Sequence, residues 1–117
     1  MASFRPWDVV RVPFPYTDRP MRQHRPALVV AAGLGSNADE LLWVLMITSA
    51  ENRPWGSDVG ISNLRAAGLP APSLVRCAKI ATIQAGDAQK IGAISASDRA
   101  AVRESLAALL AGALMHR

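Results

Sequence analysis

Apolar residues gather in short runs along most of the chain, and turn-forming residues separate these runs. Residues 8–12, Asp-Val-Val-Arg-Val, are rich in β-branched valine and are followed by prolines. Residues 27–32 form a continuous apolar run that ends at a Gly-Leu-Gly sequence, and residues 41–48 form another that contains Trp43 and Val44. Apolar runs of this length, bounded by glycine and proline, are typical of buried β-strands. We therefore predict strands over 8–12, 27–32 and 41–48.

Residues 49–72 are the least regular part of the chain because prolines and glycines recur through them. A helical turn is expected near 63–67, and further strands are expected around 73–77, 79–84 and 91–94. Successive strands with little helix between them favour antiparallel pairing. The pattern therefore predicts a mainly β fold, a small and strongly curved antiparallel sheet or barrel.

The C-terminal segment has the pattern of a helix. The sequence Ser-Ala-Ser-Asp at 95–98 supplies an N-cap and an acidic first turn. Apolar residues then recur at helical spacing, at Val102, Leu106, Leu109, Leu110 and Leu114. We expect an amphipathic helix that packs either on the sheet or on a second subunit.

Length and composition indicate the general class of protein. A chain of 117 residues, half of them hydrophobic, is of the size of one folded domain over 1–117. The single cysteine, Cys77, excludes an intramolecular disulfide and fits a reducing compartment. No apolar run reaches the roughly 18 residues of a membrane span, and the first residues lack a leader pattern. We expect a cytoplasmic protein.

The charge balance favours a polyanionic partner. The formal net charge is +4, and lysines occur only at Lys79 and Lys90, so arginine supplies most of the positive charge. Guanidinium groups bind phosphate in a bidentate manner and stack on bases, which suits nucleic acid. An arginine-rich proteome would produce the same bias, so the charge alone does not assign a function.

The chain offers few groups for metal or cofactor chemistry. Its acidic residues are scattered, whereas a metal-dependent nuclease needs several carboxylates around one ion. Cys77, His24 and His116 are too few and too far apart in sequence to form a zinc site. Neither a glycine-rich phosphate-binding loop nor a Gly-x-Ser-x-Gly motif occurs. We expect no metal and no cofactor, and an enzyme of this composition would depend on arginines, hydroxyl groups and one histidine.

Several stretches in register resemble the MazF/PemK family of toxin endoribonucleases. They begin with Trp-Asp-Val-Val-Arg-Val-Pro-Phe-Pro-Tyr-Thr-Asp at 7–18, Arg-Pro-Ala-Leu-Val-Val at 25–30 and Ile-Thr-Ser at 47–49. Similar segments at 73–80, 91–92 and 95–98 extend the resemblance over nearly the whole chain. The chain departs from common family sequences at Trp7, where a glycine usually precedes the aspartate, and at Ala81, where many members carry an arginine.

The resemblance implies a fold, an activity and partners. The expected fold is an SH3-like curved antiparallel β-barrel with a short helical turn and one C-terminal helix, acting as a homodimer. The expected activity is sequence-specific, metal-independent cleavage of single-stranded mRNA by the toxin of a type II toxin–antitoxin system. A cognate antitoxin would neutralise the toxin by laying its C-terminal segment over the RNA groove.

The resemblance assigns catalysis to Arg25 and Thr48. RNA is cleaved without metal when its own 2′-hydroxyl attacks the adjacent phosphate, which leaves a cyclic phosphate and a 5′-hydroxyl end. Arg25 can hold two phosphate oxygens and stabilise the phosphorane, and Thr48 can donate a hydroxyl hydrogen bond to the same phosphate. The family also gives the arginine an acid–base role, although a guanidinium pKa above about 12 makes it a poor base.

Other residues are candidates for supporting roles. His24 is a candidate proton donor to the leaving group, with a solvated loop histidine as the alternative. Ser49 can assist Thr48. Arginines in loops and on the later strands are candidate phosphate or base contacts, aromatic side chains are candidate stacking platforms, and an acidic loop residue can hold the arginines in place. These are Arg19, Arg22, Arg53 and Arg76, then Tyr16 and Trp55, and Asp18. Phe14 is a further candidate for base stacking, with a position in the core as the preferred interpretation.

Three alternatives remain open from sequence. A toxin of the same fold can inhibit a protein target such as DNA gyrase, and such a protein does not need an arginine–threonine site. A catalytically silent RNA-binding barrel would bind RNA without product. A β-sheet scaffold with a dimerising helix is the third alternative. The RNA motif is expected to be set by the loops at 16–24 and 50–62.

Overall fold

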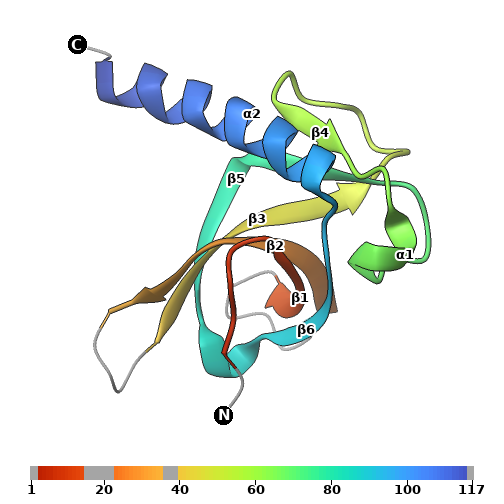
Figure 1. The fold of residues 1–117 in the computed structure, drawn as a ribbon, viewed down its shortest axis with the longest axis vertical. Coiled ribbons are helices and arrows are strands. Elements are labelled where there is room, and N and C mark those ends of the chain that lie inside the picture. Colours follow the sequence, from red (N-terminus) through yellow and green to blue (C-terminus); the bar gives the residue numbers. More distant parts are fainter. Residues whose placement is uncertain (1–2, 15–22, 36–39, 116–117) are drawn as a thin grey trace.

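The computed structural model describes residues 3–14, 23–35 and 40–115. The chain forms six strands and three helical segments of different lengths (Figure 1). The strands are β1 (Asp8–Phe14), β2 (Gln23–Leu34), β3 (Leu41–Ser49), β4 (Asp58–Gly60), β5 (Ser73–Gln84) and β6 (Gln89–Ala93). The helical segments are α1 (Leu64–Ala67), a 3₁₀ turn at Ala85–Asp87 and α2 (Ala96–Met115).

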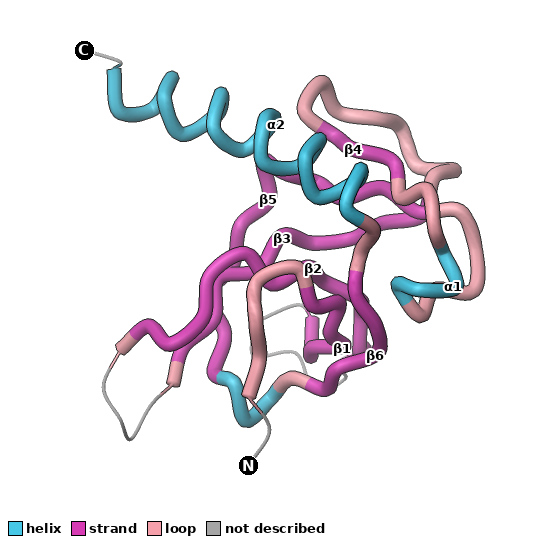
Figure 2. Tube along the Cα trace, viewed as in Figure 1, coloured by secondary structure: helices cyan, strands magenta, loops and turns pink. Residues whose placement is uncertain are grey.

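The strands form one antiparallel sheet in the order β4-β5-β3-β2-β1-β6. Figure 2 shows that this sheet is strongly curved, with α2 lying across one side. Among the described residues, the two edge strands β4 and β6 are not hydrogen-bonded to each other, so the curved sheet remains open. The mainly β, antiparallel prediction with a C-terminal helix is confirmed.

A register shift in the β3–β5 pair shapes the centre of the molecule. Leu45 pairs with Ile80, whereas Ile47 pairs with Val75, so β5 carries extra residues between these two pairs. Such bulges bend a strand and redirect its side chains. The two strands predicted at 73–77 and 79–84 are therefore one bent strand, and the bulge includes Arg76 and Lys79.

Two apolar clusters use alternate residues of the same strands. Val9 and Leu45 belong to the cluster that includes Val102 of α2, whereas their neighbours Val10 and Val44 belong to the second cluster. Successive strand residues point to opposite faces, so burial of both faces explains why the predicted strands are continuously apolar rather than alternating. Each cluster fixes one side of β1, β2 and β3.

Trp7 has a left-handed backbone conformation, with φ at 80°. Its N–H donates to the carbonyl of Val29 at 2.7 Å, and its own carbonyl accepts from the N–H of Ile94 at 3.2 Å. Glycine adopts this conformation without steric cost, whereas another residue loses about 1 kcal/mol. The indole lies 5.9 Å from the guanidinium of Arg99 and 5.4 Å from that of Arg103, both on α2. The first departure from the family pattern therefore strains the backbone but adds contacts with the helix.

The predicted start of the C-terminal helix is confirmed. Ser95 Oγ accepts from the N–H of Asp98 at 3.3 Å, and the buried Asp98 carboxylate accepts from the N–H of Ser62 at 2.7 Å. The first half of α2 packs on β4 and β5, with Val102 fully buried. The second half extends past the sheet and exposes its apolar residues, Leu109, Leu110, Leu114 and Met115 (Figure 1). No helix within 3–14, 23–35 and 40–115 is long and apolar enough to cross a membrane.

Candidate functional site

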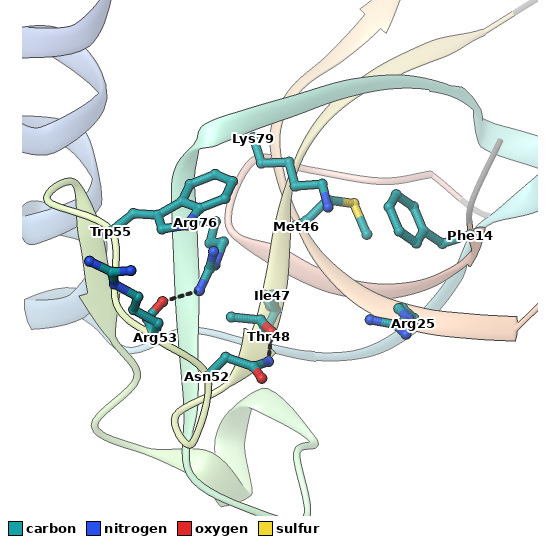
Figure 3. Close-up of a pocket in the computed structure, with 10 residues that line it drawn as sticks. All are labelled: Phe14, Arg25, Met46, Ile47, Thr48, Asn52, Arg53, Trp55, Arg76 and Lys79. Carbon is teal, nitrogen blue, oxygen red and sulfur yellow. Dashed lines mark hydrogen bonds between the residues drawn. The ribbon is translucent and has the colours of Figure 1, made fainter. Parts of the chain in front are cut away.

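A hollow of about 220 Å³ opens where β2, β3, the bulge of β5 and the segment after β3 meet (Figure 3). Arg25 from the start of β2 and Thr48 from the end of β3 both line it. The structure thus brings together the two residues that the sequence singled out. The full lining consists of Phe14, Arg25, Met46, Ile47, Thr48, Asn52, Arg53, Trp55, Arg76 and Lys79.

Arg25 has a fixed backbone and an exposed side chain. Its residue pairs with Val12 in the β1–β2 ladder, so the sheet holds the Cα in place. The guanidinium donates to Gln23 Oε1 at 3.4 Å, and its Cζ lies 5.7 Å from the centre of the Phe14 ring. Such weak contacts leave most of its five N–H donors available for a ligand.

His24 lies on another side of β2. It lines a separate hollow with Arg11 and Ile91 rather than the hollow that contains Arg25 and Thr48. The reason is the strand geometry, because adjacent residues of a strand point to opposite faces. The structure therefore does not bring His24 together with the two predicted catalytic residues.

Thr48 is half-buried, and its hydroxyl group has a defined partner. Asn52 Nδ2 donates to Thr48 Oγ1 at 2.5 Å. A hydroxyl has one donor and two acceptor positions, so a hydroxyl that accepts from an amide keeps its own hydrogen for another group. Asn52 thereby prepares Thr48 to donate into the hollow. Asn52 was not predicted from the sequence, and the available signal was its position four residues after Thr48, at the start of the irregular segment 49–72.

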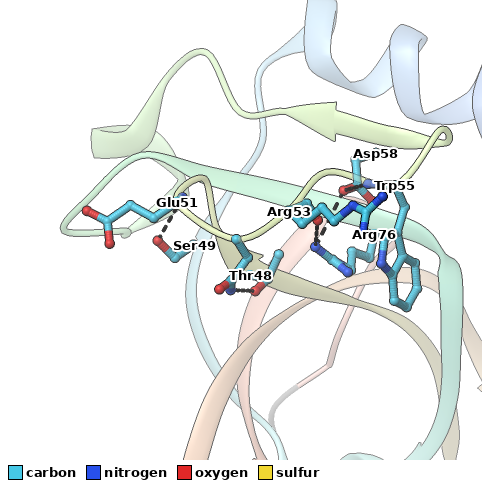
Figure 4. Close-up of polar contacts among 8 residues, drawn as sticks. Thr48, Ser49, Glu51, Arg53, Trp55, Asp58 and Arg76 are labelled. Carbon is cyan, nitrogen blue, oxygen red and sulfur yellow. Dashed lines mark hydrogen bonds and ion pairs between the residues drawn. The ribbon is translucent and has the colours of Figure 1, made fainter.

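Ser49 has a structural contact instead. Its Oγ accepts from the N–H of Glu51 at 3.2 Å, and its carbonyl accepts from the N–H of Asn52 at 3.1 Å (Figure 4). These bonds form the turn that carries Asn52 back to Thr48. Ser49 lines an adjoining hollow, also bordered by Arg25 and Thr48, that extends toward Pro70.

Arg76 is buried, and its side chain holds the segment after β3 in place. Its NH2 group donates to the carbonyl of Arg53 at 2.7 Å and lies 3.7 Å from Asp58 Oδ2, and its Cζ lies 4.1 Å from the ring centre of Trp55 (Figure 4). Asp58 Oδ2 also accepts from the N–H of Trp55 at 2.8 Å. With 10% of its side chain exposed, Arg76 places Arg53 and Trp55 at the rim while its charge still faces the hollow.

The hollow is electropositive. Four lining residues are cations, Arg25, Arg53, Arg76 and Lys79, and none of the lining residues is acidic. Clustered cations without carboxylates attract phosphate groups. The sequence pointed to Lys79 only as part of the resemblance, without a role of its own. The half-buried Phe14 packs against the second apolar cluster, in agreement with its predicted core position, and its ring also lines the hollow. Only the β5 bulge, which no apolar pattern reveals, places Lys79 here.

The remaining predicted residues are placed as follows. Tyr16, Asp18, Arg19 and Arg22 lie outside the described residues. Ala81, at the second departure from the family pattern, is partly buried against the second apolar cluster. In the part of the chain that the structure describes, no group of three or more His, Cys, Asp or Glu residues could hold a metal ion.

Cys77 is a core residue of β5. It is fully buried, and this burial raises the pKa of its thiol above the ordinary value of 9.0, although a hydrogen bond with Ser105 acts in the opposite direction. The nearby Asp58 charge raises the pKa further. A thiol whose anion is disfavoured is a poor nucleophile, so Cys77 is a packing residue of the core.

Comparison with known proteins supplies the family. The model for PemK-like, MazF-like toxins of type II toxin–antitoxin systems matches residues 5–110. No curated protein sequence matches the chain significantly.

Solved structures share the fold at low sequence identity. A MazE–MazF crystal structure from Deinococcus radiodurans superposes with a TM-score of 0.71 at 19% identity, covering 94% of this chain and 97% of that one. An endoribonuclease in complex with its cognate antitoxin, from a mycobacterial species, gives 0.67 at 17% identity, with 91% and 93% covered. The Mycobacterium tuberculosis toxin MazF-mt6 gives 0.63 at 23% identity, with 92% and 97% covered. With the family model matching most of its length, this chain belongs to the PemK-like, MazF-like toxins of type II toxin–antitoxin systems.

Proposed function

We propose that this toxin is a metal-independent, sequence-specific endoribonuclease that cleaves single-stranded RNA in the hollow around Arg25 and Thr48. One observation carries the proposal. Two residues from different strands, an arginine and a threonine with a free hydroxyl hydrogen, face one hollow whose charged lining residues are all cations. Such a site complements an RNA phosphate and the additional charge of its transition state.

The mechanism uses the substrate's own nucleophile. The 2′-hydroxyl oxygen forms a bond to the adjacent phosphorus, the P–O5′ bond breaks, and the products are a 2′,3′-cyclic phosphate and a 5′-hydroxyl. The proton lost by the 2′-hydroxyl is balanced by the one gained at O5′. Arg25 stabilises the dianionic phosphorane through two N–H donors, and Thr48 donates a third hydrogen bond.

Electrostatic stabilisation is the main catalytic term in this proposal. Neither a carboxylate nor an imidazole lines the hollow among the described residues. Arg25 is a poor base because a guanidinium stays charged at working pH, so we assign it phosphorane stabilisation and a proton-donating hydrogen bond to the leaving oxygen. His24 faces a different hollow, which argues against direct protonation by His24.

The rim of the hollow suits a single-stranded substrate. Trp55 exposes 46% of its surface, and the guanidinium of Arg76 lies against its ring. Single-stranded RNA exposes its bases for stacking on aromatic side chains. We assign Trp55 to base stacking and Arg53 to phosphate contact, with Tyr16, Asp18, Arg19 and Arg22 as further candidates in the loop before β2.

We also propose an antitoxin partner and a homodimer in the cytoplasm, with the whole chain forming one toxin domain. Two of the similar structures contain a toxin bound to its antitoxin. An acidic antitoxin segment would be attracted to the same cationic hollow and would block RNA by occupying it.

The test is cleavage of a long single-stranded RNA in EDTA, with mapping of the new 5′ ends. Wild-type protein should cut at a short recurring motif and leave 5′-hydroxyl ends, whereas Arg25→Ala should reduce cleavage at least 100-fold, in keeping with loss of one transition-state donor. Arg65→Ala is the matched control, because Arg65 is an exposed arginine of α1 away from the hollow.

Four results would contradict the proposal in different ways. A fully active Arg25→Ala variant removes the assigned mechanism, and strong inhibition by EDTA indicates a metal site. Wild-type protein that binds RNA without product is a silent RNA-binding module. Wild-type protein that neither binds nor cuts RNA supports a protein target such as DNA gyrase.

A further inference from the structure

Lys79 is a cation of the hollow to which no role has yet been assigned. Its Nζ lies 4.6 Å from the centre of the Phe14 ring, and Arg25 Cζ lies 5.7 Å from the same centre. One aromatic ring therefore holds both an ammonium and a guanidinium at the wall of the hollow. In Figure 3, Lys79 and Phe14 lie toward one side of the hollow, and Thr48 and Asn52 lie toward another.

The two lysines of the chain differ in their surroundings. Lys90 Nζ lies 3.3 Å from Asp8 Oδ1, so its charge has a counter-ion. No carboxylate of the described residues lies within ion-pair distance of Lys79, whose contact is with the Phe14 ring. A ring holds an ammonium without neutralising it, so the charge of Lys79 remains available to an anion in the hollow.

The backbone around Lys79 is shaped for this position. The β5 bulge lies between the pairs Leu45–Ile80 and Ile47–Val75, and Lys79 is one of the residues within it. Regular pairing would bring Lys79 to a different place along β3, whereas the bulge brings it to the hollow beside Met46. Bulges that redirect a side chain next to a functional site are a recurrent feature of β proteins.

We propose that Lys79, held by Phe14, binds the RNA phosphate next to the scissile one. This inference rests on the proposed function, because it assigns the scissile phosphate to Arg25 and Thr48. Consecutive phosphates of a single strand present consecutive negative charges, and a flexible ammonium accepts a phosphate as a point charge without a bidentate geometry. Lys79 thus fixes the position of the strand, and Arg25 acts on the reacting group.

The experiment neutralises single phosphates of the substrate. An oligonucleotide of the cleaved sequence receives a 2′-deoxy sugar at the cleavage site, which prevents reaction, and one methylphosphonate at each position in turn. If wild-type protein binds RNA without cutting it, the oligonucleotide has the sequence of the most tightly bound RNA instead of a cleaved sequence. Dissociation constants are measured for wild type, Lys79→Met, Lys79→Arg and the remote control Arg65→Met.

Wild-type protein should lose affinity when either the scissile or one neighbouring phosphate is neutralised. Lys79→Met should bind the unmodified oligonucleotide roughly 3- to 10-fold more weakly, as for loss of one typical hydrogen bond in an open, hydrated site, and should no longer respond to the neighbouring methylphosphonate. Lys79→Arg should keep that response, and Arg65→Met should match wild type. In a plot of log affinity against log salt concentration, the slope for Lys79→Met should be about 0.7 shallower than for wild type, which is the value for one phosphate of a single strand. In cleavage assays the loss should appear in KM rather than kcat.

The inference is overturned if Lys79→Met retains the wild-type methylphosphonate profile or loses its response at the scissile position instead. A loss in kcat with KM unchanged would also overturn it, because Lys79 would then act on the reacting phosphate. These results leave the ribonuclease proposal intact if wild-type protein cuts RNA. Wild-type protein that does not bind RNA overturns both proposals together.

Discussion

At the residue scale, the Thr48–Asn52 hydrogen bond orients the hydroxyl group to which we assign a catalytic role. Asn52→Ala removes the donor to Thr48 Oγ1, so the hydroxyl hydrogen gains alternative orientations. We expect cleavage to fall about fivefold, as for loss of one neutral hydrogen bond of about 1 kcal/mol, with little change in unfolding because Asn52 is exposed. Single-turnover cleavage at saturating RNA measures the effect.

A double-mutant cycle shows whether Asn52 acts through Thr48. In a Thr48→Val background, Asn52→Ala should reduce the rate little further, because the hydroxyl that it orients is absent. Glu51→Gln is a control in the same turn, since Glu51 is exposed and contributes its backbone N–H to the turn. Additive losses in the cycle would show that Asn52 contacts RNA directly instead.

Cys77 gives a pH dependence of stability with a definite sign. Burial raises the pKa of its thiol in the folded protein above the 9.0 of an exposed cysteine. The unfolded chain therefore releases this proton first, and the free energy of unfolding should fall as the pH rises above about 9. Urea unfolding of wild type at pH 7.5 and pH 10 measures the decrease. Cys77→Ala should be less stable than wild type at both pH values, but its free energy of unfolding should lack the part of the decrease that comes from the thiol. An equal decrease in the variant would refute the assignment of this pH dependence to Cys77.

The sequence indicated the two residues at the centre of the proposed site and part of its rim, namely Arg53, Trp55 and Arg76, which also line the hollow. Arg25 and Thr48 were found because the resemblance marked them at a strand start and a strand end. Asn52 and Lys79 were not recognised, since their positions depend on a turn closing onto Thr48 and on the β5 bulge. Arg76 was predicted to support RNA binding, and only its burial shows that it also holds the rim together.

At the element scale, the segment between β3 and β4 depends on one buried arginine. Arg76→Met removes the partner of Asp58, the hydrogen bond to the Arg53 carbonyl and the group against Trp55. Loss of one member of a buried ion pair leaves an uncompensated charge, so we expect a decrease of about 3 kcal/mol in the free energy of unfolding. Urea denaturation, followed by tryptophan fluorescence and circular dichroism, measures it.

A second variant separates the buried charge from the packing. Adding Asp58→Asn to Arg76→Met removes the unpaired carboxylate, while an amide oxygen can still accept from the N–H of Trp55. We expect the double variant to recover part of the lost stability, with Trp55 still displaced. If the double variant is less stable than Arg76→Met alone, Asp58 is stabilised by other contacts and the account of the pair is wrong.

The elements show which parts of the fold follow from local pattern. The runs at 27–32 and 41–48 lie within β2 and β3, and Ser95 begins the helix as predicted. The segment 73–84 was divided into two strands, because a bulge leaves the chain extended while it breaks the apolar pattern. β4 is only Asp58–Gly60, and its pairing with β5 is a long-range contact that no short window of sequence contains.

At the scale of the whole molecule, the outer half of α2 indicates an additional contact surface. Leu110 and Leu114 are 43% and 83% exposed, and the helix extends past the sheet at these residues. Adjacent apolar side chains left in water favour association, because their burial stabilises the complex. Together with the homodimer proposed for this toxin, this surface predicts self-association through α2.

Size-exclusion chromatography with light scattering tests this prediction. Wild-type protein should have twice the 12.5 kDa mass of the chain, and Leu110→Asp/Leu114→Asp should shift it toward monomer at micromolar concentration. Ala108→Asp is the matched control, since it adds charge to an exposed residue on the opposite helix face. If the double variant remains dimeric, self-association uses another surface and the outer part of α2 is available to a different protein. If wild type is monomeric while it cuts RNA, one chain contains a sufficient site, in agreement with Arg25, Thr48 and Lys79 all lining a single hollow of one copy.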